Sequence, residues 1–469
     1  MKDVRLRLTG RQHADLQAHL FPGDGKEAVA VALCGRAGGM GEEFLLVHKL
    51  HLIPYEKSRR HASYVHWSPL VLEPFLREAA KYDFGILKIH SHPKGHTEFS
   101  TTDDESDRKV FESVFGWLNS DRPHASAIML SDGRMIGRSI HPGIAFSTLK
   151  SIAIAGDDVR FWFQDQKSEA LPKFSERHAQ LFGSGTTRLL KKLRIAVVGC
   201  SGTGSVVVEQ LARLGVGEMI LVDHDIIEEK NLNRIVGATL EHAQKKALKV
   251  DVLAQRVEEM GLGTRVYKFP TSLEEPGALR AVSSADLVVG CMDSLVGRHV
   301  LCRLARYYLL PYVDVGVKLE ALEDGTINQI AGSVHYFQPD GSDFLDRSVF
   351  SAEALEAEGL LRYNPNAYWE RLERGYIRGV NVDRPAVISV NMLFASLAVN
   401  ELLARIHPFR LDDNAQFAST RFSLSHFHLE QESDEKVLTA RFLESVGRGD
   451  VIPPLGMPTL EKKAREIAQ

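Results

Sequence analysis

The sequence predicts an α/β fold in which a nucleotide-binding domain follows a smaller α/β domain. The first observation is a strand, turn, helix and second strand within residues 193–234, the order of one βαβ unit. The second is the alternation of short apolar strands with helical patterns through residues 1–155, which predicts an α/β or α+β sandwich. A length of 469 residues leaves room for two or three domains.

Composition and charge exclude several classes of function. Hydrophobic residues make up 44% and charged residues 25% of the chain, as in ordinary globular proteins. A net charge of -4 favours neither nucleic acid nor a membrane as partner. The four cysteines form no CxxC pair, and the first residues lack the apolar segment of a signal peptide. We therefore expect a cytoplasmic protein.

The βαβ unit carries the pattern of a phosphate-binding turn. An apolar strand at Ile195–Val198 runs into a turn with three glycines, Gly199, Gly202 and Gly204. Such glycines let the backbone approach a phosphate, and the helix that follows offers free N–H groups. The second strand, Met219–Val222, ends at Asp223, where an acid can hold a ribose hydroxyl. The stretch is predicted to bind a nucleotide. A nicotinamide oxidoreductase is an alternative, although Ser201 replaces one glycine of the dinucleotide pattern.

Further motifs follow the βαβ unit in a fixed order. They are Asp223-His224-Asp225, Asn231-Leu232-Asn233-Arg234, Lys249-Val250-Asp251, Gly290-Cys291-Met292-Asp293 and the segment from Pro385 to Asn391. Together they resemble the ThiF/MoeB and ubiquitin-activating family over roughly residues 193–403. The resemblance implies a Rossmann-like domain with a mainly parallel sheet. It also implies that ATP and Mg²⁺ serve to adenylate the C-terminal glycine of a ubiquitin-like modifier.

The same resemblance assigns roles to individual residues. The expected nucleotide-site residues are Gly199, Gly202 and Gly204 as the phosphate cradle, Asp223 for the ribose, Arg234 and Lys249 for phosphate and catalysis, Asn231 to order the site, and Asp293 for Mg²⁺. Lys246 is an alternative to Lys249. The apolar segment Ala386–Arg405 is expected to be a core helix or a homodimer contact, and its most apolar part is too short to span a bilayer.

The chain departs from that family in its cysteines. No cysteine follows Cys302, so a thioester on this chain and a structural zinc are both doubtful. The adenylate would pass to a partner, such as the cysteine of a conjugating enzyme, or to a hydroxyl such as that of Ser342.

A second set of polar residues follows the strand Phe84–Ile89. His90 and His92 are two apart on an extended strand, so their side chains point the same way. Asp103, at the start of the next helix, can complete a three-ligand set with water as fourth ligand, which is the pattern of a catalytic zinc site. A nearby carboxylate can take the proton of that water, and the hydroxyl of Ser100 can bind an oxyanion.

This second set resembles the JAMM (JAB/MPN) metalloprotease signature, H-x-H-x7-S-x2-D. The resemblance implies zinc-dependent cleavage of peptide or isopeptide bonds after ubiquitin-like modifiers. His90, His92 and Asp103 would be the zinc ligands and Ser100 the oxyanion residue. Glu27, ahead of the first core strand, would be the catalytic glutamate, with Glu42 and Glu43 as weaker candidates.

The sequence thus predicts a fusion of two enzymes. Its expected parts are a zinc metalloprotease domain (1–155), a connecting segment (156–190), an adenylation domain (191–435) and a C-terminal extension (436–469) with a helix at 435–445. The predicted function is activation of a bacterial ubiquitin-like modifier together with cleavage after the same modifier. The alternatives are activation of a sulfur-carrier protein and a non-catalytic scaffold that binds a ubiquitin-like fold.

Overall fold

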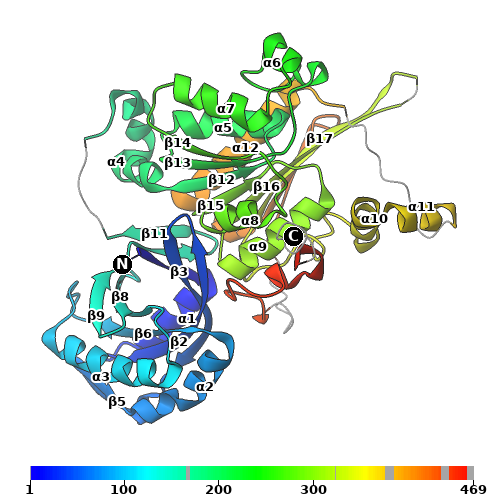
Figure 1. Ribbon diagram of the computed structural model, residues 1–469. Coiled ribbons are helices and arrows are strands. Elements are labelled where there is room, and N and C mark those ends of the chain that lie inside the picture. The colour runs from blue at the N-terminus through cyan, green and yellow to red at the C-terminus, as the bar shows by residue number, and fades with distance from the viewer. Residues whose placement is uncertain (1, 165–169, 323, 375–384, 435–442, 462–469) are drawn as a thin grey trace. The chain divides into compact units, whose positions relative to one another are not determined.

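The chain divides into two compact units, each described here by itself (Figure 1). The computed structural model describes residues 2–164, 170–322, 324–374, 385–434 and 443–461. Unit 1 comprises Met1–Glu169 with Arg306–Leu309 and Ala440–Gly456, and unit 2 comprises the rest. Residues 440–456, expected in a C-terminal extension, therefore group with unit 1. The helix expected at 435–445 falls largely outside the described residues.

A nine-stranded mixed sheet forms the centre of unit 1, in the order β11-β10-β1-β3-β2-β6-β7-β8-β9. Its strands are β1 (Val4–Thr9), β2 (Val29–Gly39), β3 (Glu42–Leu52), β6 (Gly85–His92), β7 (His124–Leu130), β8 (Met135–His141), β9 (Ala145–Thr148), β10 (Ser151–Ala155) and β11 (Val159–Phe163). A separate ribbon joins β4 (Ser58–His61) to β5 (Tyr64–Trp67). Because β11 belongs to this sheet, the segment expected to connect the domains begins as a strand of unit 1.

The sheet of unit 1 is buried on both faces, and β2 shows how the sequence achieves this. Ala30 and Ala32 enter one apolar cluster, while Val31 and Leu33 enter the other. This alternation follows from the period of two in a strand. The helices α1 (Gly10–Leu20), α2 (Glu73–Tyr82) and α3 (Thr101–Leu118) supply further apolar residues to these clusters, α1 to the first and α2 and α3 to the second.

Unit 2 is built on an eight-stranded sheet in the order β14-β13-β12-β15-β16-β17-β18-β19. Its strands are β12 (Arg194–Val198), β13 (Glu218–Val222), β14 (Arg265–Phe269), β15 (Leu287–Gly290), β16 (Tyr312–Ala321), β17 (Ile327–Phe337), β18 (Ser419–Ser423) and β19 (His428–Glu432). The first five strands are parallel and the pairings from β16 onward are antiparallel. The sheet is mixed, so the expectation of a mainly parallel sheet holds only for its first half.

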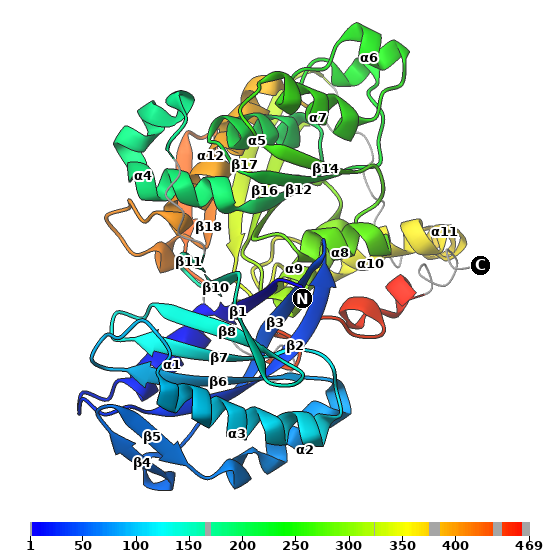
Figure 2. The ribbon, with the colours of Figure 1, turned by 60° about the vertical axis from the view of Figure 1, so that its left-hand side comes forward.

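The helices of unit 2 include one that the sequence singles out for its apolar character. They are α4 (Glu176–Lys192), α5 (Gly202–Arg213), α6 (Leu240–Gln244), α7 (Lys249–Glu259), α8 (Pro276–Ser283), α9 (Leu295–Tyr308), α10 (Ala352–Tyr363), α11 (Pro365–Glu373) and α12 (Ile388–Ile406). Among the described residues, α12 alone has the length and composition to cross a membrane, but 61% of its apolar window is buried. It packs against α5, β16 and β17, as a core helix does (Figure 2).

The parallel strands of unit 2 end at one edge, which sets the place of the site. Val198 at the end of β12 pairs with Val222 of β13 and with Gly290 of β15, and Gly290 pairs with Asp314 of β16. The loops after β12, β13 and β15 therefore emerge together, beside the first residues of β16. In open α/β sheets such an edge is where ligands bind.

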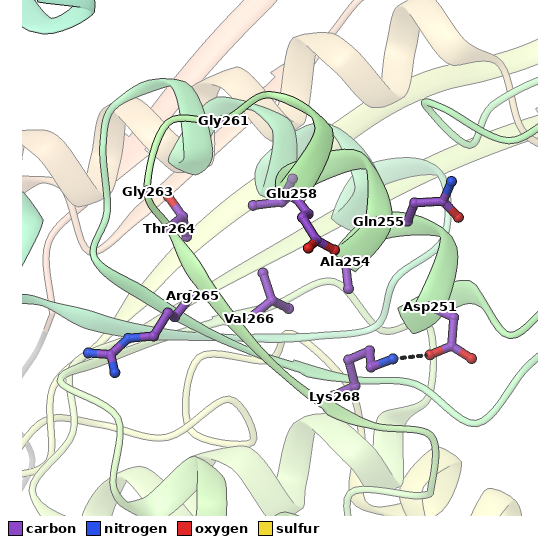
Figure 3. A pocket seen from close by; sticks show the side chains of 11 residues that line it. Asp251, Ala254, Gln255, Glu258, Gly261, Gly263, Thr264, Arg265, Val266 and Lys268 are labelled. Carbon is purple, nitrogen blue, oxygen red and sulfur yellow. Dashed lines mark hydrogen bonds and ion pairs between the residues drawn. The ribbon is translucent and has the colours of Figure 1, made fainter.

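A surface pocket of about 800 Å³ lies between α7 and the edge strand β14 (Figure 3). Lys268 and Asp251 form an ion pair at its rim, with 2.7 Å between Nζ and Oδ1. The residues that line this pocket include none of the residues that the sequence predicts for either site.

Candidate active sites

The glycine turn after β12 is packed so closely that only glycine fits. A Cβ at Gly204 would lie 1.9 Å from the carbonyl oxygen of Gly199, and one at Gly199 would lie 2.7 Å from the carbonyl oxygen of Cys291. Gly199 also has a φ of 93°, in the left-handed region that glycine tolerates. Helix α5 begins at Gly202, and the side chain of Ser201 makes no capping hydrogen bond. The first N–H groups of α5 are therefore available to an anion.

Asp223, at the end of β13, lies against this turn. Its Oδ2 accepts a hydrogen bond from the backbone N–H of Cys200 at 2.6 Å, and its Oδ1 accepts one from the N–H of Asp225 at 2.9 Å. Burial raises the pKa of the Asp223 carboxyl. The carboxylate is thus fixed beside the glycine turn, at the position that the sequence predicts for ribose binding.

Lys249 reaches the same region from the start of α7. Its side chain is buried, and Nζ lies 2.6 Å from Oδ2 of Asp225. Burial raises the pKa of Asp225, and Lys249 outweighs this and lowers it below its usual value. Lys246 lies in the preceding turn with a φ of 49°, and among the described residues it makes no hydrogen bond or ion pair with this cluster. The structure therefore brings Lys249, rather than Lys246, beside the predicted ribose acid.

Arg234 and Asn231 complete the side of the site nearest α5. The Cδ of Arg234 lies 3.0 Å from the position of a Cβ at Gly202, and Nη1 donates to the carbonyl oxygen of Lys230 at 2.8 Å. Asn231 is buried, and its Oδ1 accepts a hydrogen bond from the N–H of Glu228 at 3.0 Å. Asn231 therefore shapes the turn that presents Arg234.

Asp293 is exposed in the turn after β15. That turn is joined to the glycine loop through the close contact of Cys291 with Gly199. The structure thus places all the residues predicted for the nucleotide site around the same strand ends. An exposed carboxylate at this position has the oxygen ligands that Mg²⁺ prefers.

Two further residues at this edge received no role from the sequence. Asn391 of α12 donates from Nδ2 to Oγ1 of Thr203 at 3.0 Å, and its buried Oδ1 has no hydrogen-bond partner among the described residues. Arg298 of α9 pairs with Asp314, with 3.3 Å between Nε and Oδ1. The sequence shows Arg298 five residues after Asp293, so its place near Asp293 was predictable. The ion pair with Asp314 was not predictable, because it joins a helix to a strand.

The four cysteines and Ser342 are poorly placed to hold an acyl group. Cys34, Cys200 and Cys302 are buried and Cys291 is half-buried. Burial raises the pKa of the Cys291 thiol, and it raises that of Cys34 to about 12. Ser342 is buried, and its hydroxyl donates to Asp434 and accepts from Nε of Arg347. Ser342 thus has a structural role, contrary to the oxyester hypothesis.

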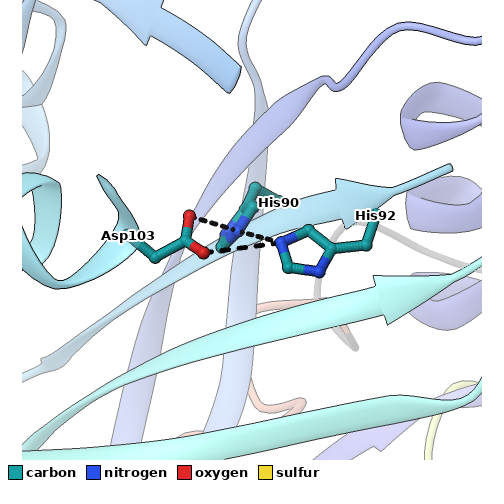
Figure 4. Close-up of side chains that lie close together, drawn as sticks. All are labelled: His90, His92 and Asp103. Atoms are coloured by element: carbon teal, nitrogen blue, oxygen red, sulfur yellow. Dashed lines mark hydrogen bonds and ion pairs between the residues drawn. The ribbon is translucent and has the colours of Figure 1, made fainter. Parts of the chain in front are cut away.

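His90, His92 and Asp103 converge in unit 1 (Figure 4). The two histidines lie on β6 and Asp103 lies in the first turn of α3. Nε2 of His90 is 3.0 Å from Oδ1 of Asp103 and 3.1 Å from Nε2 of His92, and Nε2 of His92 is 3.5 Å from Oδ2 of Asp103. Three ligand atoms thus face one point.

These three residues fit a zinc ion. Nδ1 of His92 lies 2.8 Å from the carbonyl oxygen of His96, which fixes the proton on Nδ1 and leaves Nε2 as the ligand atom. Two imidazole nitrogens and a carboxylate form the donor set of a catalytic rather than a structural zinc site, in which water is the fourth ligand.

The remaining predicted residues surround this cluster. Glu27 is buried at the start of the segment leading into β2, and burial raises the pKa of its carboxyl to about 7. Ser100 caps α3, and its Oγ donates to Oδ2 of Asp103 at 2.7 Å. Glu42 instead pairs with Arg5 and Lys150, and Glu43 pairs with Lys2. The carboxyl of Glu27 interacts electrostatically with His92 and Asp103.

Unit 2 has the arrangement of an α/β nucleotide-binding domain, with a glycine turn at a helix N-terminus and an acid at the end of the neighbouring strand. The chain belongs to the ThiF family, whose model matches residues 175–438, more than half of its length. That match confirms the predicted ThiF/MoeB-type domain. It does not extend to residues 1–155, for which the JAMM interpretation remains a prediction.

Curated relatives agree with this assignment. The adenylyltransferase and sulfurtransferase UBA4 of Meyerozyma guilliermondii is 31% identical over 134 residues, 28% of this chain and 31% of the relative. The mouse adenylyltransferase and sulfurtransferase MOCS3 is 34% identical over 107 residues, 23% of each chain. The SAMP-activating enzyme E1 of Haloferax volcanii is 28% identical over 158 residues, 34% of this chain and 53% of the relative. The chain spans about a third or less of the first two relatives.

Among solved structures, E. coli MccB with succinimide has a TM-score of 0.43 at 17% identity, covering 58% of this chain and 74% of that chain. A likeness at that level carries no argument about activity.

Proposed function

We propose that unit 2 adenylates the C-terminal carboxylate of a small sulfur-carrier or ubiquitin-like protein. The observation that carries this proposal is the glycine turn at the start of α5, flanked by Asp223 on one side and Asp293 on the other. A nucleotide in this turn would direct its ribose to Asp223 and its phosphates to the open N-terminus of α5. Membership of the ThiF family supports the same activity.

The reaction needs charge neutralisation more than it needs a covalent group on the enzyme. The substrate carboxylate attacks the α-phosphorus of ATP, and pyrophosphate leaves. Arg234 and Lys249 would bind phosphate oxygens, and Asp293 would hold Mg²⁺, which neutralises phosphate charge when bound. The product is an acyl adenylate, whose carbonyl is activated for attack by a nucleophile on another protein.

The names of the relatives favour a sulfur carrier as substrate over a modifier that is conjugated to targets. UBA4 and MOCS3 are named as adenylyltransferases and sulfurtransferases. Three of the four cysteines are buried, and the hydroxyl of Ser342 is hydrogen-bonded to Asp434. Both observations are consistent with a sulfur carrier, because a thiocarboxylate forms with a sulfur donor and needs no acyl-enzyme on this chain. The SAMP-activating enzyme E1 supports a ubiquitin-like modifier as the second candidate.

ATP–pyrophosphate exchange tests the adenylation. We expect exchange that depends on an added sulfur-carrier or ubiquitin-like protein ending in glycine, and that falls by about 10²-fold or more in Asp293→Ala. Asp412→Ala, which removes an exposed carboxylate of the same unit, is the matched control. Undiminished exchange in Asp293→Ala, or exchange that is unchanged when the added protein lacks its terminal glycine, would contradict the proposal.

A second candidate function concerns unit 1, and the convergence of His90, His92 and Asp103 favours it. We propose that unit 1 is a zinc peptidase that cleaves after a ubiquitin-like or sulfur-carrier protein. Bound zinc lowers the pKa of a water ligand towards about 7. The buried carboxylate of Glu27 would accept and return the proton, and the Ser100 hydroxyl would donate a hydrogen bond to the oxyanion.

Metal content and peptidase activity test this second proposal separately. We expect about one zinc ion per chain by plasma mass spectrometry, lost in His92→Ala and kept in the exposed control His66→Ala. Cleavage of a carrier–peptide fusion should disappear in Glu27→Gln and persist in Glu43→Gln. A chain that binds no zinc, or a Glu27→Gln variant with full cleavage, would contradict it.

A further inference from the structure

Arg298 occupies an unusual position at the predicted nucleotide edge of unit 2. It lies in the first turn of α9, five residues after Asp293. Its Nη2 is 2.7 Å from the position that a Cβ on Gly316 would take, so the guanidinium lies on the bare backbone of β16. A side chain at position 316 would displace it. Gly316 thus leaves the space that the arginine fills.

A buried carboxylate fixes the inner edge of this guanidinium. Asp314 is fully buried, with its Oδ1 3.3 Å from Nε of Arg298, and the Tyr312 hydroxyl donates to the same oxygen at 2.7 Å. Burial lowers the pKa of Arg298, but Asp314 together with Tyr312 and Asp293 outweighs this and raises the pKa above its usual value. Arg298 is therefore a permanent cation with a fixed inner edge.

Among the residues that the structure describes, no acceptor lies at the outer edge of the guanidinium. Within the described residues, neither Nη1 nor Nη2 of Arg298 donates a hydrogen bond, and the side chain is 14% exposed. Five N–H donors in a fork match a carboxyl group well. A structural counter-ion for Asp314 would not need this outer edge to reach solvent.

The cations of this edge lie on two sides of the glycine turn. Lys249 pairs with Asp225 after β13, and Arg234 packs against Gly202 at the start of α5. Arg298 lies instead over β16, which is separated from β12 by β15. A nucleotide with its ribose at Asp223 would meet the first two cations. Arg298, the third cation, is therefore free of the nucleotide and available to the carboxylate substrate.

We propose that Arg298 binds the C-terminal carboxylate of the sulfur-carrier or ubiquitin-like protein, which accepts AMP, and orients this carboxylate towards the α-phosphorus of ATP. This inference rests on the adenylation proposed above. One carboxylate oxygen forms the bond to the α-phosphorus while the bond from that phosphorus to the bridging oxygen breaks, and the electron pair leaves with pyrophosphate. Arg298 holds the other oxygen, which becomes the carbonyl oxygen of the acyl adenylate. No proton is transferred.

Two small molecules separate recognition of the acyl group from recognition of the nucleotide. The stable acyl-adenylate mimic 5′-O-(N-acetylglycylsulfamoyl)adenosine carries the acyl group, and AMP lacks it. By titration calorimetry, the full chain is expected to bind the mimic about tenfold or more tighter than AMP, since hydrogen bonds to charged groups are worth about that factor.

Two variants and one control address the arginine. Arg298→Met combined with Asp314→Asn removes the ion pair without leaving a buried charge. Arg298→Lys keeps a cation beside Asp314 but loses the fork of donors. Both are expected to lose most of the preference for the mimic while the Kd for AMP changes less than about twofold. Arg280→Met, at an exposed arginine of α8, should keep the preference.

Three outcomes would overturn the inference. Retention of the preference in both variants would make Arg298 a counter-ion only. Equal loss of AMP and mimic would assign Arg298 to phosphate. A wild-type chain that binds AMP without preferring the mimic would remove the acyl contact but leave the nucleotide site intact, whereas a chain that binds neither molecule would contradict the proposed function itself.

Discussion

Gly204 shows how closely the nucleotide edge depends on single residues. The carbonyl oxygen of Gly199 occupies the space that any larger side chain at position 204 would need. Charge is arranged as closely, because Lys249 is buried and, in the described part of the chain, pairs only with the carboxylate of Asp225. Burying a lysine ammonium group costs free energy unless the charge is paired. The burial of Lys249 in the first turn of α7 therefore indicates a functional role that a surface lysine would not have.

Replacing Lys249 should distinguish a direct contact with phosphate from a general effect of positive charge near the site. We expect Lys249→Met to lower kcat/KM for ATP in pyrophosphate exchange by about 10²-fold, because it removes a cation from the phosphates. Lys246→Met removes a nearby charge and should stay within about twofold. Equal effects of the two substitutions, measured at the same ionic strength, would show that Lys249 acts only through the general field of the protein.

Helix α3 is the element that carries Asp103, and a buried ion cluster holds it to the sheet of unit 1. Asp107, one turn after Asp103, is fully buried. Its Oδ1 is 2.7 Å from Nζ of Lys88 on β6, and its Oδ2 is 2.8 Å from Nη2 of Arg138 on β8. Burial raises the pKa of Asp107, but Lys88 and then Arg138 outweigh it, so the pKa lies below its usual value.

This cluster should make unit 1 sensitive to acid. A carboxyl with a depressed folded pKa stabilises the fold above its unfolded pKa, about 3.9, and that stabilisation is lost as the pH falls through the folded value. We expect the free energy of unfolding to decrease as the pH falls below about 4. Asp107→Asn should make the free energy of unfolding less dependent on pH and should lower it by about 3–5 kcal/mol at pH 7.

Urea unfolding of the full chain, read by hydrogen exchange in peptides from β6 and α3, measures this. Glu112→Gln, at an exposed position of α3, is the control and should change neither quantity by more than about 0.5 kcal/mol. A pH dependence of Asp107→Asn parallel to that of the wild type would show that other groups control acid unfolding.

At the scale of the whole molecule, unit 1 is assembled from segments far apart in the chain. The backbone N–H of Asp450 donates to the carbonyl oxygen of Arg36 at 2.8 Å, and Nδ1 of His48 lies 2.6 Å from the carbonyl oxygen of Val446. Gly449 has a φ of 65°, and a Cβ there would lie 2.3 Å from the carbonyl oxygen of Arg36. The segment near residue 449 is therefore part of the packed structure of unit 1.

Gly449→Ala should destabilise unit 1 more than backbone strain alone explains. Gly143→Ala is the matched control, since Gly143 also has a positive φ, 75°, but open space around it. We expect the control to cost about 1–2 kcal/mol and Gly449→Ala to cost about 1–3 kcal/mol more, read from thermal unfolding. Equal losses in the two variants would mean that the segment around Gly449 contributes no packing.

The βαβ unit was predictable because its signals are local. The strand expected at Ile195–Val198 is β12, Arg194–Val198, and the one expected at Met219–Val222 is β13, Glu218–Val222. A buried parallel strand appears as an apolar run, and glycines mark its end. The convergence of His90, His92 and Asp103 was equally local, since it needs only the period of a strand and the start of a helix.

The features that escaped prediction depend on pairing between distant residues. The sequence of β1 lacks the apolar pattern of a buried strand because it contains Arg5 and Arg7. Both arginines are nevertheless buried, Arg5 against Glu42 of β3. The pairing of β17 with β18 and the grouping of residues 440–456 with unit 1 likewise depend on partners far apart in the sequence. The ion pair of Arg298 with Asp314 belongs to the same class.

The most direct test of the account is to look for the acyl adenylate itself. The chain would be incubated with α-labelled ATP, Mg²⁺ and a sulfur-carrier or ubiquitin-like protein ending in glycine, and the acceptor analysed by intact mass and label. We expect AMP linked to the terminal glycine carboxylate, released pyrophosphate, and neither product with Asp293→Ala. Hydrolysis of ATP to ADP and phosphate, or an acceptor that never carries AMP while the chain binds both reactants, would contradict it.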